Sequence, residues 1–232
     1  MVSRRRPSDP SGRDGGFSLV EMLVAMAVFS LLITITFSLL IQIMNQSKDT
    51  IARTRAIQQA QLGIAQIDRQ VRSGNVILDP AAEGVATSGV GPFFSMRIYT
   101  QVDGEQRCAQ WRVIDEDGDT FGNLEFRTWA PGYPGVLDVD DWSIVAHNLV
   151  EMDVAPTTEA DIDPDDPTTW PPFWVDVEST GGTQAQLVRV TLRLKDPQER
   201  EGADPTSVTT VITGRNTVFG YPASSCSTAP PP

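Results

Sequence analysis

The feature that most constrains this chain of 232 residues is an apolar run near its N-terminus. Residues 22–41 carry no charged side chain, and the wider run 17–44 carries one, the acid Glu21. A helix of twenty residues rises about 30 Å, which is the hydrocarbon thickness of a bilayer. We therefore expect residues 17–44 to form a single membrane-spanning helix.

A conventional secretory signal is the first alternative for this run. Such signals have an apolar core of roughly 7–15 residues that ends at a small-residue cleavage site. The run here is longer, and its A-x-A-like tripeptide at 25–27 lies in the middle, followed by more apolar sequence. Positive charges leave the orientation open, because four arginines precede the run and Lys48, Arg53 and Arg55 follow it. The run is therefore expected to be retained rather than removed.

The junction between the leader and the apolar run carries a second signal. Residues 1–16 are rich in Arg, Gly and Pro and are expected to be disordered. They end at Gly16, Phe17 follows, and Glu21 lies just inside the run. This junction resembles the class III signal of type IV prepilins and type II secretion pseudopilins. The resemblance implies that prepilin peptidase cuts between Gly16 and Phe17, that Phe17 is then N-methylated, and that the retained helix packs into a filament.

Glu21 is costly in an apolar helix unless it finds a partner. A charged side chain at the bilayer centre costs roughly 2.5–3.5 kcal/mol. Cleavage after Gly16 would expose an amine on Phe17, and the amine of an adjacent subunit could pair with Glu21 in a low-dielectric filament core. Such a pair would also set the axial register between subunits. The alternative is that Glu21 reaches the membrane interface or interacts with the helix N-terminus.

The apolar run continues without a proline into an amphipathic segment, residues 45–74. Apolar residues recur there at spacings of three and four, at Ile57, Ala60, Ile64, Ile67 and Val71. Gly74 is a suitable C-terminal cap, so the helix is expected to end near residue 73. We expect its apolar stripe to pack on a globular head.

Residues 75–222 are predicted to form that head. Segments rich in β-branched or aromatic residues are separated by turn signals, at 93–102, 107–114, 124–130, 144–154, 173–177, 187–194 and 207–213. A hairpin is expected between 107–114 and 124–130. The acidic, proline-rich segment 155–172 is expected to be an exposed loop, and residues 223–232 a flexible tail. The predicted fold class is therefore α+β, with a long N-terminal helix packed on an antiparallel β-rich head.

Two short segments resemble one subgroup of the family. Residues 56–74 and 208–219 are similar to the helix and the C-terminal ending of J-type minor pseudopilins and W-type minor pilins. No proline occurs between residues 17 and 79, whereas the apolar segment of a major pilin often contains one. The resemblance therefore implies a minor subunit rather than a filament-forming major subunit.

Two acidic clusters are weak candidates for cation binding. One begins like a calcium loop, with Asp115, Asp117 and Asp119. However, Thr120 and Phe126 stand where such a loop needs Gly and Glu, so a solvated hairpin turn fits the sequence better. The second cluster, at 161–166, is expected to be a solvated loop. No metal and no cofactor is predicted.

A few other side chains have chemical interest. Cys108 and Cys226 would form a disulfide if the head is exported to oxidising conditions; the alternative is a buried Cys108 and a free or differently paired Cys226. His147, the single histidine, is expected to be structural, because a metal site or a catalytic dyad needs partners. Trp170 and Trp174 are expected to anchor core or loop, or alternatively to face a partner.

Composition and motifs argue against two classes of function. The net charge of −12 and the pI of about 4.4 disfavour direct nucleic-acid binding, which depends on clustered Lys and Arg. The sequence contains no P-loop, zinc-protease, nucleophile-elbow or dinucleotide-binding motif, and we predict no enzymatic activity.

The expected function is that of a minor pilin-like subunit, anchored in the inner membrane with its head outside the cytoplasm. By resemblance, it assembles into the tip or priming complex of a type II secretion pseudopilus or a type IV pilus. Its implied partners are prepilin peptidase, sibling pilins, and an inner-membrane assembly platform with a separate motor ATPase. The alternative is an uncleaved single-pass protein whose acidic β-rich head binds a ligand or an exported partner.

Overall fold

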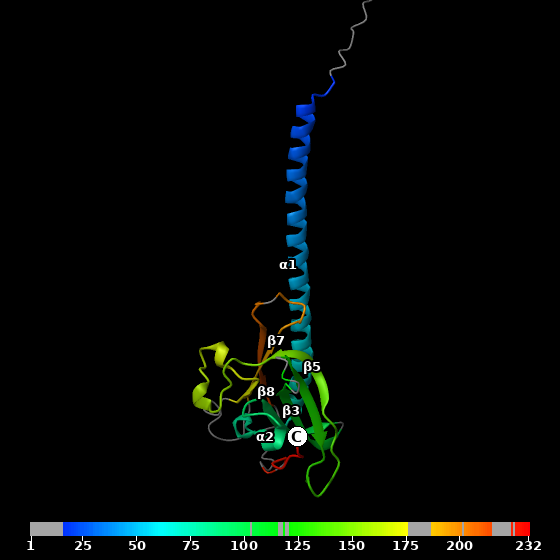
Figure 1. Ribbon diagram of the computed structural model, residues 1–232. Coiled ribbons are helices and arrows are strands. Elements are labelled where there is room, and N and C mark those ends of the chain that lie inside the picture. The colour runs from blue at the N-terminus through cyan, green and yellow to red at the C-terminus, as the bar shows by residue number, and fades with distance from the viewer. Residues whose placement is uncertain are drawn as a thin grey trace, which may run out of the picture. The chain divides into compact units, whose positions relative to one another are not determined.

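The computed structural model describes residues 16–102, 104–115, 118, 121–175, 187–200, 202–214, 224 and 226–232 (Figure 1). The chain divides into two compact units, Met1–Ser47 and Lys48–Pro232. Helix α1, Leu19–Ser73, contributes to both units. It ends one residue before Gly74, as the sequence predicts.

The first unit consists of the apolar part of α1. This part is exposed on all sides within the chain, and by length and composition α1 is able to cross a membrane. Hydroxyl groups along it donate to carbonyl oxygens three or four residues earlier, as Ser30, Thr34, Thr36 and Ser38 show. These bonds satisfy polar groups that lipid cannot hydrate.

The second half of α1 packs on the β-sheet through small side chains. Its buried face comprises Ala52, Ala56, Ala60, Gly63, Ile67, Gln70 and Val71. A Cβ added at Gly63 would lie 2.8 Å from Cδ2 of Leu124, so the helix approaches the sheet closely at this point. Ile57, which the sequence places on the packed stripe, is 37% exposed. Ala60, Ile67 and Val71 of the predicted stripe are thus buried, whereas small residues take the place of Ile57 on the packing face.

Within the described residues the sheet has eight strands, and all of their pairings are antiparallel. They are β1 (Val76–Ile77), β2 (Ser95–Val102), β3 (Glu105–Ile114), β4 (Phe121–Trp129), β5 (Ser143–Val150), β6 (Phe173–Trp174), β7 (Leu187–Leu194) and β8 (Thr206–Thr213). The order is β1-β2-β3-β4-β5-β7-β6, with β8 also paired to β7. Short helices η1 (Pro80–Ala82), α2 (Val85–Ser88), η2 (Glu159–Asp161) and η3 (Pro167–Thr169) lie in the connections.

This architecture confirms the predicted α+β class and the hairpin of β3 with β4. Some boundaries differ from the prediction. The strand expected over 144–154 ends at Val150, and residues 151–157 form an irregular segment instead. The segment expected over 173–177 is a strand only at Phe173–Trp174, and residues 176–177 lie outside the described part of the chain.

The two faces of the sheet bury different kinds of side chain. Towards α1, Met96, Ile98, Trp111, Leu124 and Leu192 form one apolar core with the helix residues. Strand residues alternate between faces, so the neighbours of these side chains point away from α1. On that second face several polar side chains are also buried, namely Ser95, Arg97, Gln110, Arg112, Glu125 and Arg127. The second face is therefore a buried polar layer.

The close approach at Gly63 predicts a strong dependence on side-chain size. Gly63→Leu should lower the free energy of unfolding by about 1–3 kcal/mol, because the added atoms would overpack the contact with Leu124. Urea denaturation of the full chain in detergent, followed by tryptophan fluorescence, measures the effect. The matched control is Leu62→Gln at an exposed neighbour, which should change stability little. Equal effects of the two substitutions would contradict the packing account.

Candidate processing site and C-terminal strap

The predicted processing junction lies in an extended, open segment before α1. Residues 16–18 precede the helix, and the first helical hydrogen bond runs from Met22 N to Ser18 O at 3.1 Å. Phe17 is 84% exposed, and among the described residues no heavy atom beyond its chain neighbours lies within 4 Å of a Cβ built on Gly16. Residues 1–15 of the predicted leader lie outside the described part of the chain. On the described side, the Gly16–Phe17 peptide is accessible to an enzyme.

Glu21 lies in the first turn of α1 and is the single charged residue of the run 17–44. Among the residues that the structure describes, its carboxylate has no ion-pair partner and its side chain is exposed. The acid therefore stands unpaired among the described residues, within an otherwise apolar stretch of the helix.

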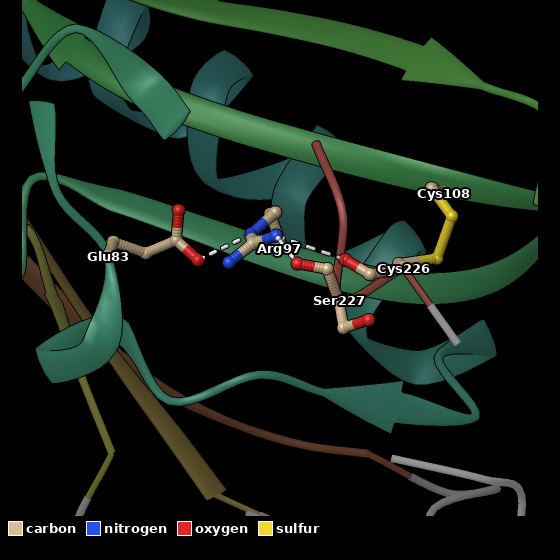
Figure 2. The surroundings of a disulfide bond; sticks show 5 residues. All are labelled: Glu83, Arg97, Cys108, Cys226 and Ser227. Atoms are coloured by element: carbon tan, nitrogen blue, oxygen red, sulfur yellow. Dashed lines mark hydrogen bonds and ion pairs between the residues drawn. A yellow bond between two sulfur atoms is a disulfide. The ribbon is translucent and has the colours of Figure 1, made fainter. Parts of the chain in front are cut away.

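A disulfide joins Cys108 in β3 to Cys226 near the C-terminus, with the two Cα atoms 5.6 Å apart (Figure 2). Both cysteines are buried in a cluster with Val76, Tyr99 and Trp129. This pairing is one of the two alternatives that the sequence left open. The bond fixes the last residues of the chain on the polar face of the sheet.

Arg97 in β2 binds the backbone beside this disulfide. Its Nη1 donates to Cys226 O at 3.1 Å and to Ser227 O at 2.8 Å, and its Nε donates to Glu83 Oε1 at 2.5 Å (Figure 2). Both charged side chains are almost completely buried. A buried ion pair is tolerated when further hydrogen bonds satisfy it, and the chain-end carbonyls supply them here.

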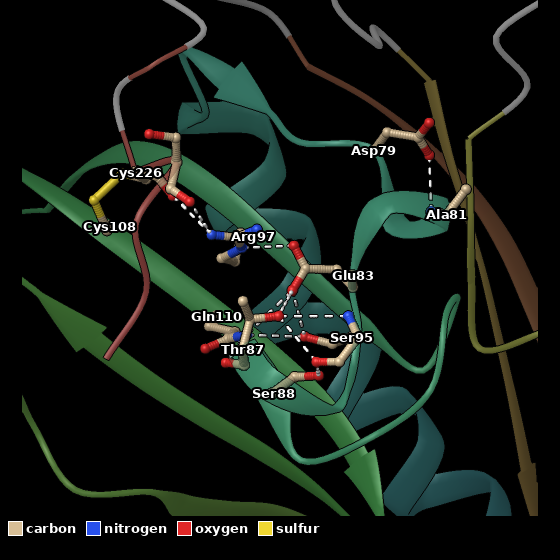
Figure 3. A network of polar contacts seen from close by, with 12 residues as sticks. Asp79, Ala81, Glu83, Thr87, Ser88, Ser95, Arg97, Cys108, Gln110 and Cys226 are labelled. Atoms are coloured by element: carbon tan, nitrogen blue, oxygen red, sulfur yellow. Dashed lines mark hydrogen bonds and ion pairs between the residues drawn. A yellow bond between two sulfur atoms is a disulfide. The ribbon is translucent and has the colours of Figure 1, made fainter. Parts of the chain in front are cut away.

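Glu83 connects this pair to a second layer of polar contacts (Figure 3). Its Oε2 accepts from the Ser95 hydroxyl at 3.4 Å and from Gln110 Nε2 at 3.3 Å. Gln110 Oε1 in turn accepts from Arg127 Nε at 3.0 Å and Nη2 at 2.7 Å. The three strands β2, β3 and β4 are thus joined through their side chains as well as their backbones.

Arg127 holds the other end of the C-terminal segment. Its Nη1 donates to Pro231 O at 2.7 Å and its Nη2 to Pro230 O at 2.8 Å. We call residues 226–232 the C-terminal strap. The prediction of a flexible tail over 223–232 is wrong for the strap, because its carbonyl groups accept from buried arginines and Cys226 is covalently bonded.

The strap covers a layer with an excess of positive charge. Arg97 and Arg112 each pair with a glutamate, Glu83 and Glu125, whereas Arg127 has carbonyl and amide acceptors. Burial, and after it the charge of Arg112, lowers the pKa of Arg127 to about 10. The guanidinium therefore remains charged at neutral pH.

The indole of Trp142 lies against both Arg112 and Arg127. The two guanidinium carbons lie 4.0 Å and 4.2 Å from the ring centroid. Cation–π contacts of this kind supply some of the stabilisation that burial removes from the arginines.

The weak calcium candidates divide between described and undescribed residues. Asp115 Oδ1 accepts from Gly118 N at 2.8 Å, as in a hairpin turn, while Asp117 and Asp119 lie outside the described residues. In the described ranges, no group of three or more His, Cys, Asp or Glu side chains is arranged to hold a metal ion.

The acidic loop is anchored by its own caps and by aromatic contacts. Asp161 Oδ2 accepts from the backbone amides of Thr157 and Thr158, and these bonds lower the pKa of Asp161. The Arg189 guanidinium lies 4.0 Å from the Trp170 ring centroid and 4.6 Å from that of Trp174. These tryptophans therefore anchor the loop.

His147 has a structural contact. Its Nδ1 forms a hydrogen bond with Asn123 Oδ1 at 2.9 Å, linking β5 to β4.

Comparison with known proteins bears on the N-terminus. The family model of the prokaryotic N-terminal methylation motif matches residues 12–37. No curated protein and no solved structure matches the chain. The motif supports a membrane-anchored protein of the pilin or pseudopilin type and confirms the resemblance seen at the junction. It implies processing by prepilin peptidase and assembly with other pilins, and proteins that carry it are generally structural.

The strap suggests a test of the disulfide. Replacing both Cys108 and Cys226 with Ala should lower the free energy of unfolding by about 2–5 kcal/mol, because the bond closes a long loop in the unfolded chain. Hydrogen exchange of the strap amides should also become faster. Ser227→Ala is the matched control, since it leaves the Ser227 carbonyl that Arg97 binds. Unchanged exchange in the double variant would show that the arginines hold the strap without the disulfide.

Proposed function

We propose that this prepilin-type chain is cleaved between Gly16 and Phe17 and serves as a minor pilin-like subunit. The observation that carries the proposal is the match to the methylation motif, which spans the accessible Gly16–Phe17 peptide and the start of α1. In this proposal the mature protein assembles into the tip or priming complex of a type II secretion pseudopilus or a type IV pilus.

Glu21 would direct assembly through charge pairing. It is an unpaired acid within the described part of an apolar run, and such a charge is expensive in lipid. Cleavage supplies a new cation, the amine of Phe17, on every mature subunit. In the proposed filament, the Glu21 carboxylate of one subunit pairs with the Phe17 amine of a neighbour, which offsets desolvation and fixes the axial register.

The disulfide supports a head outside the cytoplasm. Structural disulfides form and persist in oxidising compartments and are rare in the cytosol. We therefore place Lys48–Pro232 on the extracytoplasmic side of a single-pass anchor in the inner membrane. An assembly platform and a separate motor ATPase would supply the work of assembly, because this sequence has no nucleotide-binding motif.

A minor rather than a major role follows from two features. No proline interrupts residues 17–79. The similarity of residues 56–74 and 208–219 to J-type minor pseudopilins and W-type minor pilins points the same way, although residues 215–219 lie outside the described part of the chain.

N-terminal sequencing and intact mass of membrane-extracted protein test the cleavage. The expected product begins at N-methylated Phe17. Gly16→Glu should abolish cleavage, because the peptidase of this family cuts after Gly, whereas Gly15→Ala should preserve it. A chain that begins at Met1 or Val2 would contradict the proposal and favour an uncleaved membrane-anchored binding protein.

Crosslinking between subunits tests the role of Glu21. Glu21→Gln removes the charge at nearly constant volume, so cleavage should continue while incorporation with sibling pilins falls at least tenfold. Met22→Leu is the matched control at the adjacent exposed position. Normal incorporation of the Glu21→Gln protein would rule out the charge-pairing account while leaving the cleavage result intact.

A further inference from the structure

We propose that two adjoining cavities on the head bind an extended polypeptide segment of a partner, with a Lys or Arg side chain between two apolar side chains. The larger cavity has a volume of about 630 Å³ and lies between the segment that follows β5 and the start of β8. The smaller has a volume of about 310 Å³ and lies between residues 89–94 and the end of β3. Both are lined by Glu151 and Pro156, so they share a wall. We call them the paired cavities.

Apolar side chains form much of both linings. The larger cavity includes Val150, Met152 and Val154 from the segment after β5. The smaller includes Phe94 and Val113. Apolar surface in a concave site favours apolar ligand groups, because their transfer from water is favourable. Two apolar side chains of one extended segment suit two hollows that share a wall.

The acidic side chains around the paired cavities favour a positively charged ligand. Glu151 lies at the shared wall, and Asp153 and Asp204 line the larger cavity. Among the described residues none of these three carboxylates makes a hydrogen bond or an ion pair, in contrast to Asp161, which accepts from Thr157 and Thr158. These three carboxylates therefore give the paired cavities negative charge that no direct contact within the described residues neutralises.

Arg193, the one basic residue among the described residues of either lining, makes no direct contact with these carboxylates. Its Nη2 donates to Pro167 O at 3.0 Å and to Thr168 O at 2.7 Å, so its hydrogen bonds are directed to the acidic loop. Burial lowers the pKa of Arg193, while the charges of Asp153 and Asp166 oppose that shift. Its contacts hold the loop that forms one side of the larger cavity.

A basic side chain fits both properties of the site. The aliphatic stems of Lys and Arg lie well on apolar surface, while their cationic heads seek carboxylates. A cation placed at the shared wall would meet Glu151, and its flanking apolar side chains would enter the two hollows. An anionic segment would meet repulsion, and opposite charge would also speed the encounter with a basic one.

Selection from a phage-displayed library of random heptapeptides tests the proposal on the full chain in detergent. The bait is the parent protein, with counter-selection on the Glu151→Gln/Asp153→Asn/Asp204→Asn protein. Enriched peptides should carry Lys or Arg flanked by apolar residues. Enrichment of sequences without a cation, or no enrichment over the counter-selected protein, would overturn the proposal.

Fluorescence anisotropy with the most enriched peptide gives the quantitative test. Its dissociation constant should rise at least tenfold for the triple variant and fall with lower ionic strength for the parent. Asp165→Asn is the control, since Asp165 is an exposed acid of the acidic loop outside both cavities, and this variant should bind the peptide as tightly as the parent. An equal loss in the control would mean that net charge alone, and not the paired cavities, attracts the peptide, and would overturn the proposal.

These variants also separate this inference from the function proposed above. None of the substituted acids lies near the processing junction in sequence, so N-terminal sequencing should find Phe17 first in every variant. Thermal unfolding by circular dichroism checks that each head remains folded. A failure of peptide binding with normal processing would reject the paired cavities alone.

Discussion

The structure depends on one helix that meets two different requirements along its length. Up to about residue 44 its side chains are mostly apolar on every side, with Glu21 the one charged exception, which suits lipid or the apolar helices of other subunits. From Ala52 onwards a single face is buried, and small residues bring that face close to the sheet. A continuous backbone without proline allows both patterns to occupy the same helix. The sheet is then organised around the small-residue face, with its apolar side chains directed towards α1.

The polar face of the sheet shows a different principle of stabilisation. Three arginines and two glutamates are buried there, and desolvation of so many charges is costly. The cost is offset because each of the three guanidinium groups donates to several specific acceptors, including carbonyl groups of the C-terminal strap. Proline residues suit this role well, since each presents a carbonyl acceptor and lacks an amide that would itself need a partner. The strap is therefore an integral part of the head.

The sequence predicts the helix, the hairpin and the strand positions because each depends on local periodicity. The 187–194 strand and the end of α1 at Ser73 illustrate this, since alternation and a following Gly are visible in the chain itself. The same reasoning fails for part of the packing face of α1, because the residues there are small. Ala52, Ala56 and Gly63 carry little hydrophobic signal, so the more apolar Ile57 is chosen in their place. Only the proximity of Leu124 reveals why a glycine is needed.

The strap escapes prediction for a related reason. Serine and proline near a chain end are typical of flexible tails, and the acceptors that matter are backbone carbonyls, which every residue has. The partners Arg97 and Arg127 lie more than one hundred residues away in sequence. Charged residues at alternate positions of a strand indicate a polar face of the sheet, but they do not indicate which segment covers that face. The junction at Gly16 and Phe17, in contrast, can be predicted from the sequence, because its signal lies in a few neighbouring residues.

The disulfide also determines how the head responds to mechanical load. Tension that enters through α1 and leaves through the chain end passes directly from Cys108 to Cys226, which are 118 residues apart in sequence. The covalent bond carries the load past the residues between them. Fully extended, this segment would be about 400 Å long at the usual length per residue, and the disulfide prevents that length from being released. Most of the β-sheet can thus lose its hydrogen bonds without lengthening the tether, and a stretched head remains short.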